Sequence, residues 1–280
     1  MDQARKYLAE FLGTFIMVFF AVTANSSGPI AGALVGLGQV AAVNGLGVTL
    51  AIYTTADISG AHLNPAVTLV FAVWHSFPWS NVAGYFVAQF AGAICAAGLN
   101  YGLYSSTIAR FEAMSGIVRG AAGIGKECID LWTVLSKSRC FPIPVESSPE
   151  HIASLQSFVS PGLAFLTEMV GTAILLFVIL SLIDKKNTSI SPHIVPVLIG
   201  CTVTSLISVL APITQAGFNP VRDFAPRLVA LAVGWGQIAI PGPRNGFWVY
   251  ILGPIVGAQL GAALHYVLYK ATSVSLRYPP

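Results

Sequence analysis

SGAHLNPAV at residues 59–67 and GFNPVRDFAPR at residues 217–227 each place an Asn-Pro pair in front of an apolar segment that is too short to cross a membrane. Asn is favoured at the N-cap of a helix and Pro at its first position, so each pair predicts the start of a short helix. These helices are expected at about 65–75 and 220–232. One Asn-Pro pair alone would indicate an ordinary turn, but two in matched settings indicate a pair of related half-helices.

The composition indicates that lipid surrounds much of the chain. Hydrophobic residues make up 55% of its 280 residues and charged residues only 9%, whereas a soluble domain carries about 25% charged residues. Six further apolar segments are each long enough to cross a hydrocarbon core of about 30 Å as a helix. They lie at about 6–24, 31–56, 81–104, 161–183, 193–212 and 246–269. We therefore predict an all-α transmembrane protein with six spanning helices and two half-helices, because continuous apolar runs exclude the alternating pattern of a β-barrel.

The two halves of the chain resemble each other. Glu10 opens a Glu-Phe-Leu-Gly-Thr run in the first spanning segment, and Glu168 opens a Glu-Met-Val-Gly-Thr run in the fourth. Asn64 and Asn219 follow at nearly the same distance in each half. Each half has three spanning segments, an odd number, so the halves face the membrane in opposite senses, and a transport site is expected near the midplane. We predict a single channel domain over 1–280, with a first repeat at about 1–104, a long loop at about 105–160 and a second repeat at about 161–280.

Basic residues predict the orientation. Arg5 and Lys6 precede the first predicted span, Lys185 and Lys186 lie between the fourth and the fifth, and Lys270 and Arg277 follow the sixth. With six crossings these positions all fall on one side of the membrane. Cytoplasmic loops carry an excess of Lys and Arg, so both termini are predicted to be cytoplasmic, in a plasma membrane or an organelle membrane. Cys128 and Cys140 lie in the long loop, and the sequence leaves open whether they form a disulfide.

The Asn-Pro pairs predict how the channel treats charge. Half-helices that begin at Pro65 and Pro220 would meet at their N-termini near the middle of the membrane, and each would carry about half a positive charge from its peptide dipoles. A cation or proton is repelled there, whereas a neutral solute accepts hydrogen bonds from the amides of Asn64 and Asn219. Arg222 would add a second positive barrier, and its counterpart in the first half is Val67.

The residues before each Asn are expected to be extended and to present their backbone carbonyls to solutes, because irregular backbone at membrane depth is tolerated where it lines a cavity. These residues are Gly60, Ala61 and His62 in the first half and Gln215, Ala216 and Gly217 in the second. Glu10 and Glu168 are carboxylates inside apolar segments and need partners. We expect them to brace these loops by accepting backbone N–H groups. A proton relay through them is the alternative, but the sequence offers no third buried acid.

Both boxes resemble the Asn-Pro-Ala boxes of the aquaporin, or major intrinsic protein, family, and the similarity covers nearly the whole chain. The resemblance implies a right-handed six-helix bundle with two half-helices, one pore per subunit and a homotetramer. Asp223 is similar to the glycerol-conducting branch, and we expect it to hold the second-box loop by accepting local N–H groups. Val221 is a departure, since it makes the second box Asn-Pro-Val.

The resemblance also maps the narrow filter of the family onto Asn44, Ile207, Ala216 and Arg222. Glycerol facilitators typically have aromatic residues at two of these positions, whereas none is aromatic here, and Asn44 makes the constriction more polar. The function expected is a passive channel for glycerol and other small neutral solutes plus water, which excludes protons and ions. A water-dominant channel, or one tuned to urea, larger polyols or metalloid hydroxides, remains the alternative.

Other classes of function are less consistent with the sequence. A secondary transporter would need ion-coordinating acids at the midplane, where this sequence has Asn. An enzyme would need a nucleophile or a second metal ligand beside His62, and none is placed there. We therefore expect no enzymatic activity, no cofactor and no metal. The partners expected are small neutral solutes and the lipid bilayer, and the net charge of +3 gives no indication of nucleic-acid binding.

Overall fold

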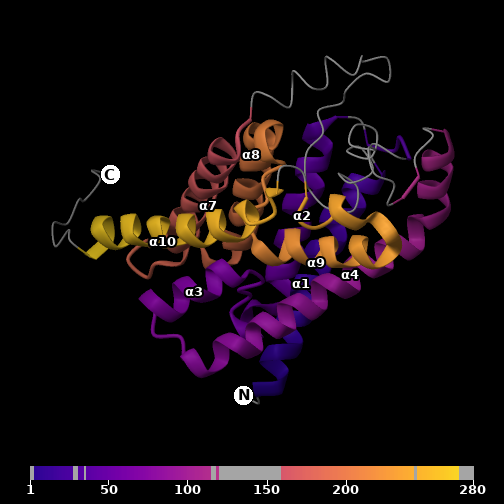
Figure 1. Cartoon of the computed structure of the whole chain (residues 1–280). Coiled ribbons are helices and arrows are strands. Elements are labelled where there is room, and N and C mark those ends of the chain that lie inside the picture. The colour runs from indigo at the N-terminus through magenta and orange to yellow at the C-terminus, as the bar shows by residue number, and fades with distance from the viewer. Residues whose placement is uncertain are drawn as a thin grey trace.

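The computed structural model describes residues 3–27, 31–34, 36–114, 118–119, 159–242 and 245–270. Cys128 and Cys140 lie outside the described residues. Within these ranges six helices are long and apolar enough to span a membrane. They are α1 (Gln3–Asn25), α2 (Leu37–Ser59), α4 (Trp79–Met114), α7 (Pro161–Ile183), α8 (Val195–Thr214) and α10 (Val249–Lys270) (Figure 1).

Two short helices follow the Asn-Pro pairs. They are α3 (Pro65–Trp74) and α9 (Pro220–Ala230), and each begins at the predicted proline. A π-helical turn, η3 (Leu231–Trp235), and a 3-10 turn, η4 (Gly236–Ile238), continue the chain after α9. The predicted all-α architecture of six spanning helices and two half-helices is therefore confirmed.

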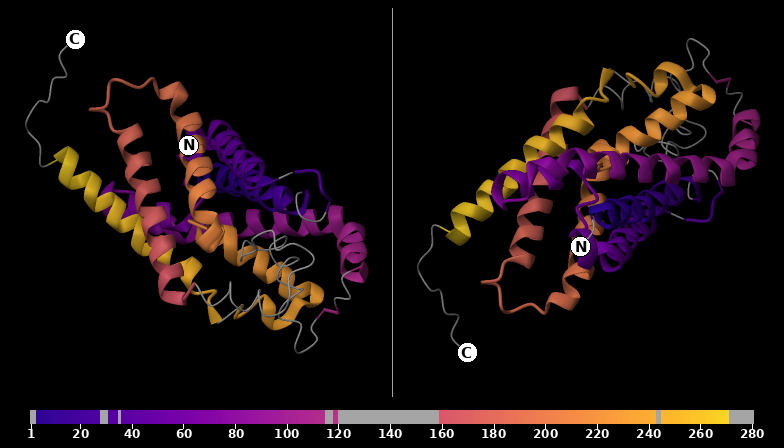
Figure 2. Two further views of the ribbon diagram at one scale, coloured as in Figure 1. Left: turned by 90° about the horizontal axis from the view of Figure 1, so that it is seen from above. Right: turned by 90° about the horizontal axis from the view of Figure 1, so that it is seen from below.

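The helix packing repeats itself when the two halves are exchanged. α1 packs on α2 and α4, as α7 packs on α8 and α10, while α3 touches α10 as α9 touches α4. α2 and α8 pack on each other across the middle, and the half-helices α3 and α9 also meet. Figure 2 shows α7 next to α10 at one side of the bundle and α1 next to α2 at the other. This is the packing of an inverted repeat.

Glycines allow the closest helix crossings, and they too occur in pairs. A Cβ atom at Gly92 of α4 would collide with the carbonyl oxygen of Phe11 in α1. Its counterpart, Gly257 of α10, approaches the carbonyl oxygen of Met169 in α7 in the same way. Small residues of this kind let membrane helices pack backbone against backbone.

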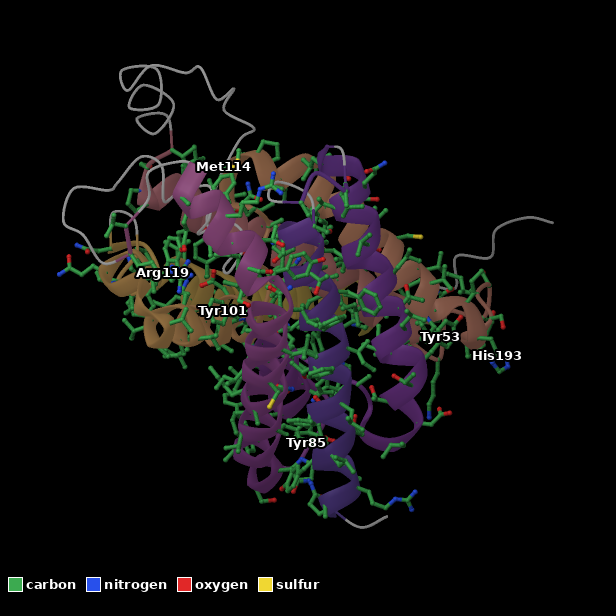
Figure 3. The ribbon with its side chains drawn as sticks, turned by 90° about the vertical axis from the view of Figure 1, so that its right-hand side faces the viewer. Tyr53, Tyr85, Tyr101, Met114, Arg119 and His193 are labelled. Carbon is green, nitrogen blue, oxygen red and sulfur yellow. The ribbon has the colours of Figure 1, made fainter. Side chains whose placement is uncertain are left out.

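Helix α4 ends ten residues beyond its predicted end, at Met114 rather than at 104. The hydropathy signal stops early because the last turns of α4 are polar, yet Ile108 there is fully buried. Arg119 contacts two side chains in this part of α4. Its guanidinium is 2.6 Å from the Glu112 carboxylate and 2.8 Å from the hydroxyl of Tyr101 (Figure 3). The bond to Glu112 raises the pKa of Arg119 above its usual value. Arg119 also donates to the carbonyl of Val233, which ties the end of α4 to η3.

Candidate functional site

The side chains of Asn64 and Asn219 cap the two half-helices. The Oδ1 of Asn64 accepts from the backbone N–H of Ala66 at 2.9 Å, and that of Asn219 accepts from Val221 at 3.1 Å. Both asparagines have extended backbones, which is the usual conformation of an N-cap residue. Each amide oxygen is therefore committed to its own helix.

The amide nitrogens of the same two residues reach across to the opposite repeat. Asn64 Nδ2 donates to the carbonyl of Phe218 at 2.9 Å, and Asn219 Nδ2 donates to the carbonyl of Leu63 at 2.8 Å. The two bonds are reciprocal, so the N-termini of α3 and α9 are held against each other. An amide group has two N–H donors. The reciprocal bonds use one N–H of each asparagine, and at Asn219 the other acceptor that the structure describes is the weak sulfur of Met17, 4.0 Å away.

Two buried glutamates hold the loops that lead into the asparagines. Glu10 accepts hydrogen bonds of 2.9 and 2.8 Å from the N–H groups of the two residues before Asn64. Glu168 accepts bonds of 2.9 and 2.7 Å from the two residues before Asn219. Both carboxylates are 0% exposed. A buried carboxylate at membrane depth needs such donors, so each glutamate and its loop depend on each other.

The loops before the asparagines are not extended, which corrects the prediction. Ala61 and Leu63 in the first loop, and Ala216 and Phe218 in the second, all have left-handed backbones with φ of 48–54°. In an extended strand successive N–H groups point to opposite sides, so one carboxylate cannot accept from two neighbours. Left-handed residues bring successive N–H groups to one side as an anion-binding nest. The buried glutamates therefore explain the backbone.

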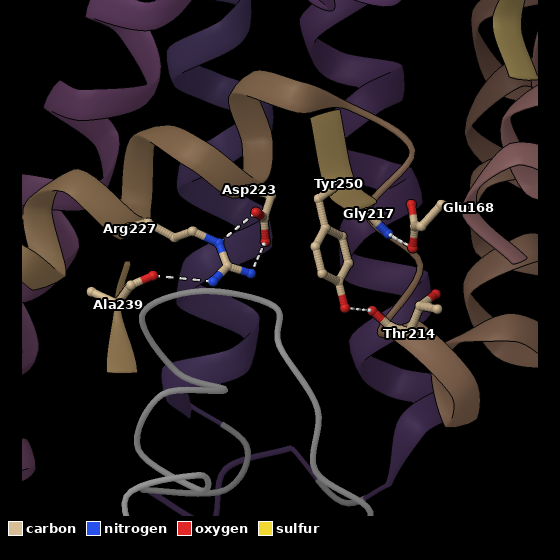
Figure 4. Close-up of polar contacts among 7 residues, drawn as sticks. All are labelled: Glu168, Thr214, Gly217, Asp223, Arg227, Ala239 and Tyr250. Atoms are coloured by element: carbon tan, nitrogen blue, oxygen red, sulfur yellow. Dashed lines mark hydrogen bonds and ion pairs between the residues drawn. The ribbon is translucent and has the colours of Figure 1, made fainter. Parts of the chain in front are cut away.

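A tyrosine supports each loop from behind. The hydroxyl of Tyr85 in α4 donates to the carbonyl of Ser59 at 2.7 Å, and Tyr250 in α10 donates to the carbonyl of Thr214 at 2.9 Å (Figure 4). Ser59 and Thr214 are the last residues of α2 and α8. These contacts fix where each spanning helix ends and its loop begins.

A cavity of about 240 Å³ runs past both asparagines. Along α2 its wall extends from Ala56 to Asn44, a path of about 18 Å at 1.5 Å per residue. Apolar side chains from α1, α2, α3, α7 and α8 form most of the wall. The predicted site residues on the wall are Asn44, Gly60, Ala61, His62, Asn64, Gly217, Asn219 and Arg222. Within the part of the chain that the structure describes, no donor reaches the carbonyl oxygens of Gly60, Ala61 and His62.

Arg222 and Asn44 meet at one end of this cavity. The Arg222 guanidinium donates to the carbonyls of Ala216 and Gly217 at 2.8 and 2.9 Å and to Asn44 Oδ1 at 2.5 Å. Asn44 in turn donates to the carbonyl of Val40 one helical turn earlier. A guanidinium has five N–H donors. These bonds use three of them, and among the described residues no acceptor is found for the other two.

Comparison with known proteins agrees with this geometry. Residues 1–266 match the profile of the major intrinsic protein family. The chain belongs to this family. It is 40% identical over 263 residues to the glycerol uptake facilitator protein of Pseudomonas aeruginosa, which covers 93% of this chain and 87% of that protein. It is 41% identical over 257 residues to the glycerol uptake facilitator protein of Escherichia coli K12, covering 91% and 84%.

Two further proteins extend the comparison. A propanediol uptake facilitator of Salmonella typhimurium is 38% identical over 259 residues, covering 92% of this chain and 90% of that protein. The X-ray structure of the aquaglyceroporin from Plasmodium falciparum superposes with a TM-score of 0.77 at 24% identity, covering 97% and 98% of the two chains. The fold of this chain is thus the fold of an aquaglyceroporin.

The structure places two of the four mapped filter residues off the cavity wall. Ile207 and Ala216 are 2% and 0% exposed and pack in the hydrophobic core. Ala216 still takes part through its carbonyl, which binds Arg222. Val203, one helical turn before Ile207, is the α8 residue on the wall near this end. An offset counted from Asn219 does not fix the rotation of α8, which is why Val203 went unnoticed in the sequence.

Asp223 has a different partner from the one predicted. Its carboxylate does not brace loop N–H groups but pairs with Arg227, at 2.5 Å from Nε and 3.0 Å from Nη2 (Figure 4). Arg227 also donates to the carbonyl of Ala239 and lies over the ring of Tyr250. Both members of the pair are 1% exposed. The acid–base spacing of four residues on one helix was the sequence signal for Arg227.

Proposed function

We propose that the chain is a passive channel for glycerol and other small neutral solutes, that water also passes, and that protons and ions are excluded. The observation that carries the proposal is the reciprocal pair of hydrogen bonds from Asn64 and Asn219. It holds two helix N-termini together on the wall of a cavity that residues of both repeats enclose. Two relatives named glycerol uptake facilitators and one named a propanediol uptake facilitator support the choice of solute.

The chemistry of the wall matches a polyol. A molecule such as glycerol has hydroxyl groups that donate and accept, and carbon atoms that avoid water. The carbonyls of Gly60, Ala61 and His62 can accept from its hydroxyls, and the amides of Asn64 and Asn219 can donate to them. The remaining apolar wall can contact the carbon chain. A solute therefore exchanges its hydrogen bonds with water for bonds to the wall at low cost.

Two positive features oppose cations. The N-termini of α3 and α9 each carry about half a positive charge, and both point at the same section of the cavity. Arg222 adds a full charge nearer the Asn44 end. The asparagine donors also orient the oxygen of a passing water, which interrupts the chain of hydrogen bonds along which a proton would move. Neutral solutes experience none of this repulsion.

The remaining assignments follow the family. We propose a single channel domain over the whole chain, with both termini in the cytoplasm, assembled as a homotetramer and without enzymatic activity. The basic residues at the ends of α1, α7 and α10 support this orientation. Exposed apolar side chains on the spanning helices, such as Leu50, Val209 and Leu264, provide surface for lipid and for other subunits.

Stopped-flow light scattering on proteoliposomes tests the proposal. Glycerol entry is expected to exceed that of protein-free liposomes many-fold, while proton entry stays at the protein-free level. Val203→Trp serves as the control, since an indole at this wall position would fill the cavity and abolish glycerol entry. Glycerol entry no faster than through bare lipid, with fast water entry, would instead identify a water-dominant channel.

A further inference from the structure

A second cavity of about 430 Å³ lies beside the inner end of the conduit, where α3, α7 and α10 end together, and Ile183 contributes to the walls of both. Trp74 and His75 of α3, Asp184 to Lys186 after α7, and His265 and Tyr266 of α10 line it. This end carries the basic residues that predict a cytoplasmic position. The cavity is therefore at the depth of the lipid headgroups on the side that we propose is cytoplasmic.

The lining of this cavity has two layers. Leu180, Ile183 and Ala262 form an apolar floor. The rings of Trp74 and Tyr266 stand 5.5 Å apart, and the indole N–H of Trp74 is fixed by a 2.8 Å bond to Gln259. Trp and Tyr of this kind mark the boundary between acyl chains and headgroups. An occupant with an apolar part and a polar head would match both layers.

The cavity carries a positive charge, because two lysines, Lys185 and Lys186, line it together with one carboxylate, Asp184. Asp184 accepts a 2.8 Å bond from the backbone N–H of Lys186, and its carboxylate lies 3.2 Å from Nε2 of His265. The Lys186 ammonium donates to the carbonyl of Tyr269 at 2.7 Å, which uses one of its three N–H groups. Lys185 and Lys186 are both exposed, and their ammonium groups are not paired with Asp184. The two lysines can therefore bind an anion.

We propose that this cavity binds the phosphate headgroup of an anionic phospholipid, with Lys185 and Lys186 as its ligands and the acyl chains leaving over Trp74 and Tyr266. Exposed apolar residues continue the path of the chains beyond the cavity: Val73 is 54% exposed and Val267 is 62% exposed. A free phosphate ion would use the lysines but neither the apolar floor nor the aromatic rim. Basic pockets between membrane helices on the cytoplasmic side are typical binding sites for anionic headgroups.

The test compares the binding of phosphatidylglycerol and phosphatidylcholine with identical acyl chains to the purified full-length protein, by native mass spectrometry. The double variant Lys185→Gln/Lys186→Gln is compared with Arg5→Gln/Lys6→Gln, which removes two basic charges at the same end of the bundle. Each lysine near an anionic surface contributes on the order of fivefold in binding. The first variant is therefore expected to lose about 25-fold of the preference for phosphatidylglycerol, and the second to keep it.

Equal losses in the two double variants, or no loss in either, would overturn the proposal. Displacement of phosphatidylglycerol by millimolar inorganic phosphate would also overturn it, because the site would then take free phosphate. Glycerol entry at the wild-type rate shows that each variant is folded. Lys185→Gln alone, which removes no hydrogen bond within the described chain, keeps the test decisive if the double variant does not fold; it should lose about fivefold.

Discussion

Replacement of Glu168 by Gln tests how far the conduit depends on its buried carboxylates. The Glu168 carboxylate accepts two short bonds from backbone N–H groups, at 2.9 Å from Gly217 and 2.7 Å from Phe218. In Glu168→Gln one of the two oxygens becomes an NH₂ group that faces an N–H donor. One charge-assisted bond, of about 1.5–3 kcal/mol, is lost, and one buried N–H is left without an acceptor at a cost of about 1–3 kcal/mol.

Part of this loss is offset, because a neutral amide is less costly to bury than a carboxylate. We therefore expect a net destabilisation of about 2–4 kcal/mol. At about 2–4 °C per kcal/mol, the melting temperature in detergent should fall by about 5–15 °C. The left-handed loop before Asn219 should also lose its fixed geometry, so glycerol entry per folded channel should fall as well. Thermal unfolding by intrinsic fluorescence and stopped-flow glycerol entry measure the two effects.

A matched control lies on the same helix. Ser181→Ala removes an ordinary 2.8 Å bond from a side-chain hydroxyl to the carbonyl of Phe177. It should change the free energy of unfolding by about 0.5–1.5 kcal/mol and leave glycerol entry unchanged. If Glu168→Gln melts within error of Ser181→Ala, the carboxylate is not what holds the loop, and the account of the left-handed backbone fails with it.

Three further predictions concern the charged groups at the conduit. Asn219→Asp adds a negative charge where two helix N-termini meet, so entry of protons or sodium into proteoliposomes should rise by on the order of tenfold, and unchanged ion entry would contradict the electrostatic account. Arg222→Ala removes the guanidinium that binds Asn44, so entry of larger polyols should increase relative to glycerol in a stopped-flow series, and a preserved solute ranking would show that this arginine does not limit the passage. Arg227→Met leaves Asp223 buried and unpaired, and should lower the free energy of unfolding by about 3–5 kcal/mol, as measured by thermal unfolding. Addition of Asp223→Asn should restore part of this loss, and no recovery in the double variant would show that the two residues do not act as a pair.

The spans and half-helices could be predicted because hydropathy and the Asn-Pro caps act locally. The end of α4 could not, because its last turns are stabilised by contacts with residues far along the chain, including the Arg119 bond to Val233. The loop backbone was also beyond local reasoning. Extended backbone is the default for irregular segments. Left-handed residues such as Ala61 and Phe218 are needed only because each glutamate accepts hydrogen bonds from two successive backbone N–H groups.

Symmetry explains which partners could be found from the sequence. Glu10 and Glu168 occupy equivalent positions, so one hypothesis covered both, and their contacts are equivalent in the structure. Where the halves differ, comparison of one half with the other gives no guide. In the first half Gln89 donates to Glu10 at 2.8 Å, whereas the matching position in the second half is Pro254.

The second half has its own buried charges where the first half is neutral. Thr68 stands at the position that matches Asp223, and Ala72 at the position that matches Arg227. Arg222 has a carboxylate as its neighbour in sequence, yet its donors bind carbonyls and Asn44 rather than that carboxylate. The pairing of Asp223 with Arg227 makes this possible, because a neutralised carboxylate no longer competes for the guanidinium of Arg222. The Asp223–Arg227 ion pair thus leaves the Arg222 guanidinium available to bind the carbonyls of its loop and Asn44, so the position of Arg222 depends on Arg227.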